Sequence, residues 1–189
     1  MRVVIAEDEA LIRMDLREML ESEGHEVIGE ARDGAEAVAL ARALQPDVVF
    51  MDISMPNVDG IKAAATIGAE SMVPVVMVTA YSQASLVEEA ARAGAMGYVV
   101  KPFSSSDIIP AMQVAVARRT EVALLEKEIA DLNERLATRK ALDQAKGILM
   151  AAGLTEPEAF RRLQKLAMDR RKTLREVAEA VITARDALA

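Results

Sequence analysis

Acidic, hydroxyl and ammonium side chains follow short apolar runs in the first half of this 189-residue sequence. In chain order they are Glu7 and Asp8, Asp52, Thr79 and Lys101. Clustered carboxylates favour a hard divalent cation such as Mg²⁺, which takes oxygen ligands. A carboxylate beside such a cation can attack an activated phosphoryl group, while an ammonium and a hydroxyl hold the phosphoryl oxygens. These residue types therefore predict phosphoryl chemistry if folding brings them together.

Apolar runs and amphipathic helical patterns alternate through the first 117 residues. Five runs are predicted to be strands: 3–6, 26–31, 47–52, 73–80 and 96–102. Five β/α repeats with short links predict an α/β fold with a five-stranded, parallel, doubly wound sheet. Ligands of such sheets bind outside the carboxyl ends of the strands. The polar residues above stand at those ends, so they converge if their strands are neighbours.

The remaining sequence is helical in pattern. Five apolar residues with spacings of 3, 4, 3 and 4 predict either a short coiled-coil seam or a helix packed on its own domain: Val122, Leu125, Ile129, Leu132 and Leu136. Thr155 and Thr173 begin capping-box patterns, so two shorter helices follow. Apolar residues from Leu142 to Ile182, with Phe160 among them, are expected to form the core of an all-α three-helix domain.

These patterns divide the chain into three parts: residues 1–117, a helical or coiled-coil linker at 118–137, and the three-helix part at 138–189. The first part carries 8 Lys and Arg against 18 Asp and Glu, a net charge of −10. Residues 118–189 carry 15 against 12, a net charge of +3. An acidic half joined to a mildly basic half indicates two separate tasks.

Composition narrows the class of protein. The chain has no Cys, which excludes disulfides and thiolate metal sites and fits a reducing compartment. No apolar run reaches the roughly 18 residues that a membrane span needs. The acidic residues at 7–9 come too early for a secretory signal. We therefore expect a cytoplasmic protein without a membrane partner.

Four segments of the first 117 residues resemble response regulator receiver domains. They are EDE (7–9), MDISMPNVDG (51–60), VTA (78–80) and YVVKPF (98–103). The resemblance implies a flavodoxin-like fold in which Asp52 accepts a phosphoryl group from a sensor histidine kinase. It also implies a regulator with at most slow autodephosphorylation, and not an enzyme.

The resemblance assigns roles to the other residues of this site. Asp8, Asp52 and the backbone carbonyl of Ser54 would ligate Mg²⁺, and Glu7 would reach the metal directly or through a water. Thr79 and Lys101 would contact the phosphoryl group, and the Lys101–Pro102 bond is expected to be cis. Tyr98 would be a switch that rotates as Thr79 moves inward. A bulky Tyr81 is predicted to hinder hydrolysis of the phosphoryl group.

Residues 139–182 resemble an ANTAR domain, a three-helix RNA-binding module. The matching segments are AKGILM (145–150), EAF (158–160) and TLREVA (173–178). The order of the parts resembles actinobacterial phosphorylation-dependent antitermination regulators, which bind paired RNA hairpins in nascent transcripts. The cations expected to contact RNA phosphates are Arg139, Lys140, Lys146, Arg170, Arg171 and Lys172. With Phe160 assigned to the core, base stacking on aromatic residues is expected to contribute little.

Two other functions compete with this interpretation. A helical output domain that binds DNA is the main alternative, although the turn at 168–173 contains no Gly. A phosphatase or haloacid-dehalogenase-like hydrolase would need a second carboxylate two residues after Asp52, where Ser54 stands. The seam permits a homodimer, and we expect a monomer that associates on phosphorylation.

Overall fold

The computed structural model describes residues 1–70, 73–80 and 84–186. The chain divides into two compact units, Met1–Ala123 and Leu124–Ala189. Helix α5 (Ser105–Ala151) is continuous and contributes residues to both units. The boundaries predicted at residues 117 and 137 stay predictions, since both fall inside this one helix.

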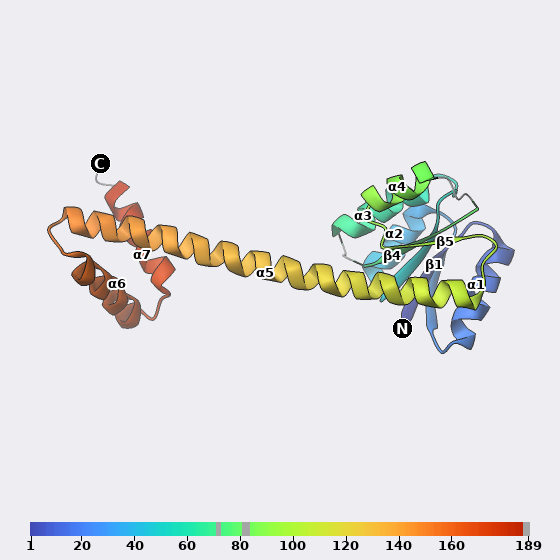
Figure 1. Cartoon of the computed structure of the whole chain (residues 1–189), viewed down its shortest axis with the longest axis horizontal. Coiled ribbons are helices and arrows are strands. Elements are labelled where there is room, and N and C mark those ends of the chain that lie inside the picture. Colours follow the sequence, from blue (N-terminus) through green and yellow to red (C-terminus); the bar gives the residue numbers. More distant parts are fainter. Residues whose placement is uncertain (71–72, 81–83, 187–189) are drawn as a thin grey trace. The chain divides into compact units, whose positions relative to one another are not determined.

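Unit 1 is an α/β fold, and the predicted class is confirmed (Figure 1). Its parallel strands are β1 (Arg2–Ala6), β2 (Glu26–Ala31), β3 (Val48–Asp52), β4 (Val75–Thr79) and β5 (Gly97–Val100). Between them run α1 (Ala10–Ser22), α2 (Gly34–Leu44), α3 (Gly60–Glu70) and α4 (Ala84–Arg92). The strand order is β2-β1-β3-β4-β5, so the strands followed by the candidate residues are consecutive in the sheet.

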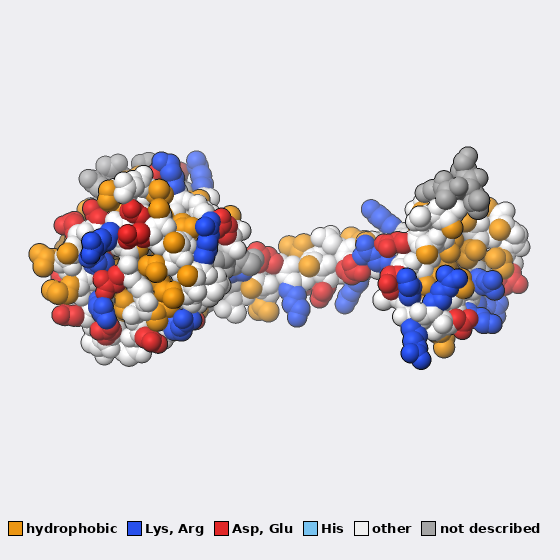
Figure 2. Space-filling view, turned by 180° about the vertical axis from the view of Figure 1, so that it is seen from behind, with side chains coloured by type: hydrophobic (Ala, Val, Ile, Leu, Met, Phe, Trp, Pro, Cys, Tyr) orange, Lys and Arg blue, Asp and Glu red, His pale blue; other side chains and the backbone are white. Residues whose placement is uncertain are grey.

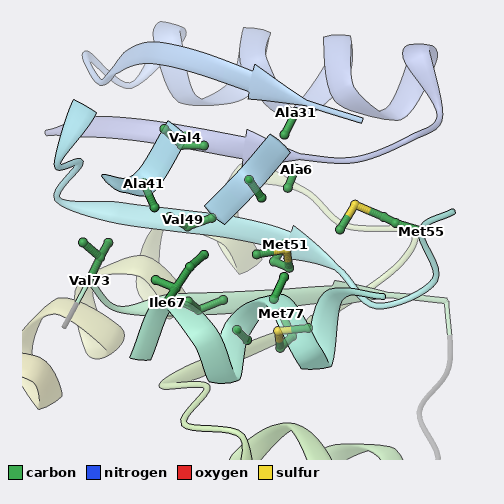
Figure 3. Packing of buried hydrophobic residues seen from close by; sticks show 14 of the residues in the cluster. Val4, Ala6, Ala31, Ala41, Val49, Met51, Met55, Ile67, Val73 and Met77 are labelled. Carbon is green, nitrogen blue, oxygen red and sulfur yellow. The ribbon is translucent and has the colours of Figure 1, made fainter. Parts of the chain in front are cut away.

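Two apolar layers cover the faces of the sheet. Helices α2, α3 and α4 pack on one face, where Val4, Val49 and Met77 alternate with residues of the other face (Figure 3). Helix α1 and the first turns of α5 cover the other face, against residues such as Phe50. Strands β3 and β4 are buried along their whole length, as expected for parallel strands covered on both faces.

Unit 2 packs the last turns of α5 against α6 (Glu156–Arg170) and α7 (Leu174–Asp186). Thr155 and Thr173 form the predicted capping interactions with Glu158 and Glu176. The buried core consists mostly of small side chains: Ala141, Ala145, Leu163, Ala167, Val177 and Ala178.

Phe160 does not belong to this core, and the prediction that placed it there is wrong. Its side chain is 37% exposed, whereas the preceding Ala159 is fully buried. The buried stripe of α6 runs through Ala159, Leu163 and Ala167, at spacings of one helical turn. Phe160 lies one residue away from that stripe, on the flank of the helix.

The five seam residues are at the surface of α5. Their exposed fractions run from 38% at Val122 to 58% at Ile129. Figure 2 shows hydrophobic side chains reaching the surface along the middle of this helix. None of the described helices is both long enough and apolar enough to cross a membrane.

Candidate functional site

The candidate phosphoacceptor lies at the carboxyl edge of the sheet. Asp52 is the last residue of β3 and Thr79 the last of β4, while Glu7 follows β1 directly. In the sheet register Asp52 pairs with Val78, and Thr79 pairs with Val100, the residue before Lys101. Because the strands are parallel and in this order, the sheet brings these residues to one edge.

Lys101 links the two buried carboxylates of this edge. Its Nζ lies 2.6 Å from Glu7 Oε2 and 3.4 Å from Asp52 Oδ1. The side chains of Glu7 and Asp52 are 2% and 7% exposed, whereas Asp8 is exposed. One carboxylate oxygen from each of Glu7, Asp8 and Asp52 lies within 4.8 Å of the others. The site is therefore open to solvent at Asp8, while the carboxylates of Glu7 and Asp52 are almost fully buried.

Burial dominates the electrostatics of the pocket. It raises the pKa of the Asp52 carboxyl, against the opposing effect of the Lys101 ammonium. Burial also raises the pKa of Glu7, and the charge of Asp52 adds to that rise although Lys101 opposes it. Burial alone would lower the pKa of Lys101, but its pairing with Glu7 and the charge of Asp52 raise it instead. Lys101 therefore stays charged, and a further cation would relieve the crowded carboxylates.

Thr79 and Tyr98 form the other side of the site. Thr79 is fully buried, and its hydroxyl shares a hydrogen bond with the half-buried Tyr98. Ser54 is exposed two residues after Asp52, and the Lys101–Pro102 bond is cis, as expected. Tyr81 lies outside the described residues.

Two residues that support the acidic pocket were not found from the sequence. Arg13 of α1 is buried, and its Nη1 donates to the carbonyl of Glu7 at 2.6 Å and to that of Asp8 at 3.4 Å. Its Nε donates to Glu30 at 3.1 Å, which fixes the guanidinium from the other side. Gly60 approaches the Asp52 carbonyl so closely that an added Cβ would lie 1.9 Å from that oxygen.

The candidate RNA contacts fall into two groups in unit 2. Lys146 is paired with Asp143 at 3.0 Å and with Glu156, at the start of α6, at 2.9 Å. Arg170, Arg171 and Lys172 are exposed at the other end of this 15-residue helix. Since α6 spans about 22 Å, the structure does not bring these two groups together. Arg139 and Lys140 are exposed on α5.

Comparisons with known proteins identify both units. A family model described as the response regulator receiver domain matches residues 3–113, and one described as the ANTAR domain matches residues 130–182. The chain is 57% identical to the transcriptional regulatory protein PdtaR of Mycobacterium tuberculosis over 182 residues, 96% of this chain and 89% of that protein. This chain belongs to the response regulators. Its receiver and ANTAR domains make it a phosphorylation-dependent regulator that controls transcription through RNA binding.

The receiver domain alone also matches known proteins in sequence and in structure. The chemotaxis protein CheY of Thermotoga maritima is 40% identical over 112 residues, which cover 59% of this chain and 93% of CheY. The response regulator domain of Thermotoga maritima CheB has a TM-score of 0.58 at 34% identity, covering 62% of this chain and 96% of that one.

The acidic pocket fits the Mg²⁺ ion that receiver domains typically bind. Glu7 Oε2 is buried, and no donor in the described part of the chain makes a hydrogen bond of suitable angles to it. Its contact with Lys101 is an ion pair, which leaves the oxygen free to accept a second partner. Three carboxylates of mixed exposure are the donor set that a hard cation prefers.

Proposed function

We propose that this response regulator accepts a phosphoryl group on Asp52 from a sensor histidine kinase, and that its ANTAR domain then binds RNA hairpins in nascent transcripts as a transcription antiterminator. The observation that carries the proposal is the buried Asp52 carboxylate beside Lys101 and two further acids, in a chain that ends in an ANTAR domain. Since nascent transcripts are its proposed target, we expect the protein in the cytoplasm.

The residues of the site have distinct tasks in this transfer. An Asp52 carboxylate oxygen forms a bond to phosphorus while the phosphorus–nitrogen bond of a phosphohistidine breaks, and the leaving imidazole takes up a proton. Lys101 and Thr79 hold the phosphoryl oxygens. Glu7, Asp8, Asp52 and the Ser54 carbonyl would hold Mg²⁺, which would neutralise charge on the phosphoryl oxygens. Ser54 offers no general acid or base, so release of the phosphoryl group to water is slow.

The switch begins at Thr79. When its hydroxyl turns to a phosphoryl oxygen, the hydrogen bond between Thr79 and Tyr98 is lost and the Tyr98 ring is free to rotate. The ring borders a hollow of about 140 Å³ that Val87, Ala90 and Met96 also line. When the Tyr98 ring moves into this hollow, the side chains around it repack. Phosphorylation of Asp52 thereby changes the surface formed by α4 and β5.

We further propose that phosphorylation favours a homodimer through the seam on α5. Leu125, Ile129 and Leu132 are each at least half exposed, and pairing two such helices would remove them from water. Sedimentation with and without a small-molecule phosphodonor measures this directly. A mass that stays that of one chain in both states would contradict the dimer.

The decisive experiment compares nucleic acids. We expect the full chain to bind a two-hairpin RNA more tightly after treatment with a phosphodonor and Mg²⁺, and to bind duplex DNA of the same length weakly at the same salt concentration. If the DNA bound more tightly than the RNA, the output domain would have to be reassigned as DNA-binding. If phosphorylation left the RNA affinity unchanged, the receiver domain would not control RNA binding by the ANTAR domain.

Arg13→Met is expected to weaken Mg²⁺ binding about tenfold, because the carbonyls of Glu7 and Asp8 lose the donor that orients their loop. Calorimetric titration of the unphosphorylated chain with Mg²⁺ measures the change. Arg17→Met is the matched control, since Arg17 pairs with the same Glu30 at 2.6 Å but, among the described residues, makes no hydrogen bond or ion pair with the acidic loop. If both variants lost the same amount of Mg²⁺ affinity, the pairing with Glu30 would account for the effect, and the hydrogen bonds from Arg13 to the acidic loop would not.

A further inference from the structure

The ANTAR domain contains a pocket between α5 and the start of α6 whose apolar wall has no role in the function proposed above. Its volume is about 320 Å³, at the lower end of the range typical of small-ligand sites. Leu142 and Phe160 give it an apolar wall, and Arg135, Arg139 and Lys146 surround that wall with cations. All of these residues except Phe160 lie on one face of α5, at spacings of three or four residues.

Phe160 presents an aromatic surface in this pocket. It is the only aromatic residue in the sequence from 124 to 189, and more than a third of its side chain is exposed. An exposed phenyl ring loses the stabilisation that core burial would give it. An unpaired nucleobase of any of the four kinds can stack on such a ring.

The charges of the pocket favour a phosphate-bearing ligand, because its two acids already have partners: Glu134 pairs with Arg175 and Asp143 with Lys146. Arg135 is exposed and makes no ion pair within the part of the chain that the structure describes. Arg139 is 83% exposed, and its pairing with Asp143 is loose at 3.9 Å. Lys146 is held by Asp143 and Glu156, so it shapes the wall rather than offering a free charge. The two arginines, one turn apart, are therefore the groups available for phosphates.

The same region is poorly suited to a second copy of the chain. Continued at its own spacing, the seam that ends at Leu136 would next use Arg139, Asp143 and Lys146. These are charged residues, so an apolar helix–helix contact stops where the pocket begins. The pocket is open at that point for a different kind of ligand.

We propose that this pocket takes one unpaired base of an RNA hairpin loop, which stacks on Phe160 while Arg135 and Arg139 hold the neighbouring phosphates. This inference rests on the proposed RNA-binding function and names the site at which a loop is read. It also gives Phe160 a task that its exclusion from the helical core leaves open.

The absence of tryptophan from the chain provides a direct test. Phe160→Trp introduces a single indole into the full-length protein, and stacking of a base should quench its fluorescence on addition of a two-hairpin RNA. Met168→Trp is the matched control, because Met168 is 79% exposed on the same helix and does not line the pocket. The expected result is quenching in the first variant only, and only when the RNA loops are unpaired.

Affinity measurements complete the test. Phe160→Leu should weaken RNA binding about tenfold without changing its salt dependence, while Arg139→Ala should reduce the salt slope by about one. RNA binding that is intact in wild type and in Phe160→Leu, with no quenching in Phe160→Trp, overturns the base pocket and leaves the proposed function standing. An absence of RNA binding in wild type overturns both. A changed oligomer mass in Phe160→Leu, with unchanged RNA affinity, assigns the pocket to a second copy instead.

Discussion

Asp52→Asn is expected to abolish phosphorylation by a small-molecule phosphodonor and, with it, any tightening of RNA binding by that donor. The amide lacks the nucleophilic carboxylate oxygen but keeps nearly the same shape. Intact-mass measurement after treatment with the donor and Mg²⁺ checks the first effect, and RNA titration checks the second. Asp59→Asn is the control, because Asp59 lies in the loop after β3, is paired with Lys62, and is not one of the three carboxylates of the acidic cluster.

The same substitution should stabilise the receiver domain at neutral pH. Burial raises the pKa of Asp52 in the folded state, so its ionised carboxylate opposes folding. The contribution of Asp52 to the free energy of unfolding is therefore favourable while the group is protonated, and it is lost as pH rises through the folded-state pKa. The neutral amide avoids that cost, so the free energy of unfolding should rise by about 1 kcal/mol or more. The gain should shrink as pH falls and Asp52 becomes protonated in the wild type.

Unfolding of the receiver domain can be followed by tyrosine fluorescence. Both tyrosines, Tyr81 and Tyr98, belong to unit 1, and the chain has no tryptophan. Urea titrations at neutral and mildly acidic pH then compare wild type with Asp52→Asn. A loss of stability in the variant at neutral pH would mean that the pairing with Lys101 outweighs the cost of burying the carboxylate.

Gly60→Ala is expected to lower the free energy of unfolding of the receiver domain by about 3 kcal/mol and to slow phosphorylation strongly. The added methyl group would lie 1.9 Å from the carbonyl oxygen of Asp52 and 2.9 Å from its carbonyl carbon. Backbone cannot yield as a flexible side chain does, so the phosphoacceptor or the first turn of α3 must move. The hydrogen bond from the Gly60 amide to the Ile53 carbonyl, 2.9 Å long, would be disturbed as well.

Gly68→Ala is the matched control in the same helix. Among the described residues, a Cβ at Gly68 would meet only the Ala93 carbonyl oxygen, at an ordinary 3.8 Å. Alanine favours the helix by up to about 1 kcal/mol over glycine, so this variant should be as stable as the wild type or more so. If Gly60→Ala and Gly68→Ala behaved alike in urea unfolding and in phosphorylation rate, the close approach to Asp52 would have no importance.

The sheet and the positions of the chemical residues could be predicted because they follow from local patterns and one general rule. Apolar runs marked the strands, and the polar residue after each run marked its carboxyl end. The rule that ligands bind at those ends then grouped Asp52, Thr79 and Lys101. The strand order itself was not readable from spacing alone, although the resemblance to receiver domains implied it.

Other features depend on contacts that no spacing reveals. Arg13 looks like any cation on an amphipathic helix until the fold turns its guanidinium to the carbonyls of Glu7 and Asp8. Phe160 was misassigned because a shift of one residue in helical phase moves a side chain by about 100° around the axis. The continuity of α5 past residue 137 could have been read from the sequence, since no Gly or Pro interrupts residues 111–146.

The alanine-rich core of unit 2 has a consequence for how long the protein survives. Its fully buried side chains are mostly small, and leucines such as Leu142, Leu149 and Leu166 are only partly buried, so the three helices are held together by a smaller free energy than fully buried leucines would give and open more often. Proteases cut such transiently opened segments. Bound RNA stabilises the closed form by mass action. We therefore expect the C-terminal unit to resist proteolysis when its RNA is abundant and to be cut first when that RNA is scarce.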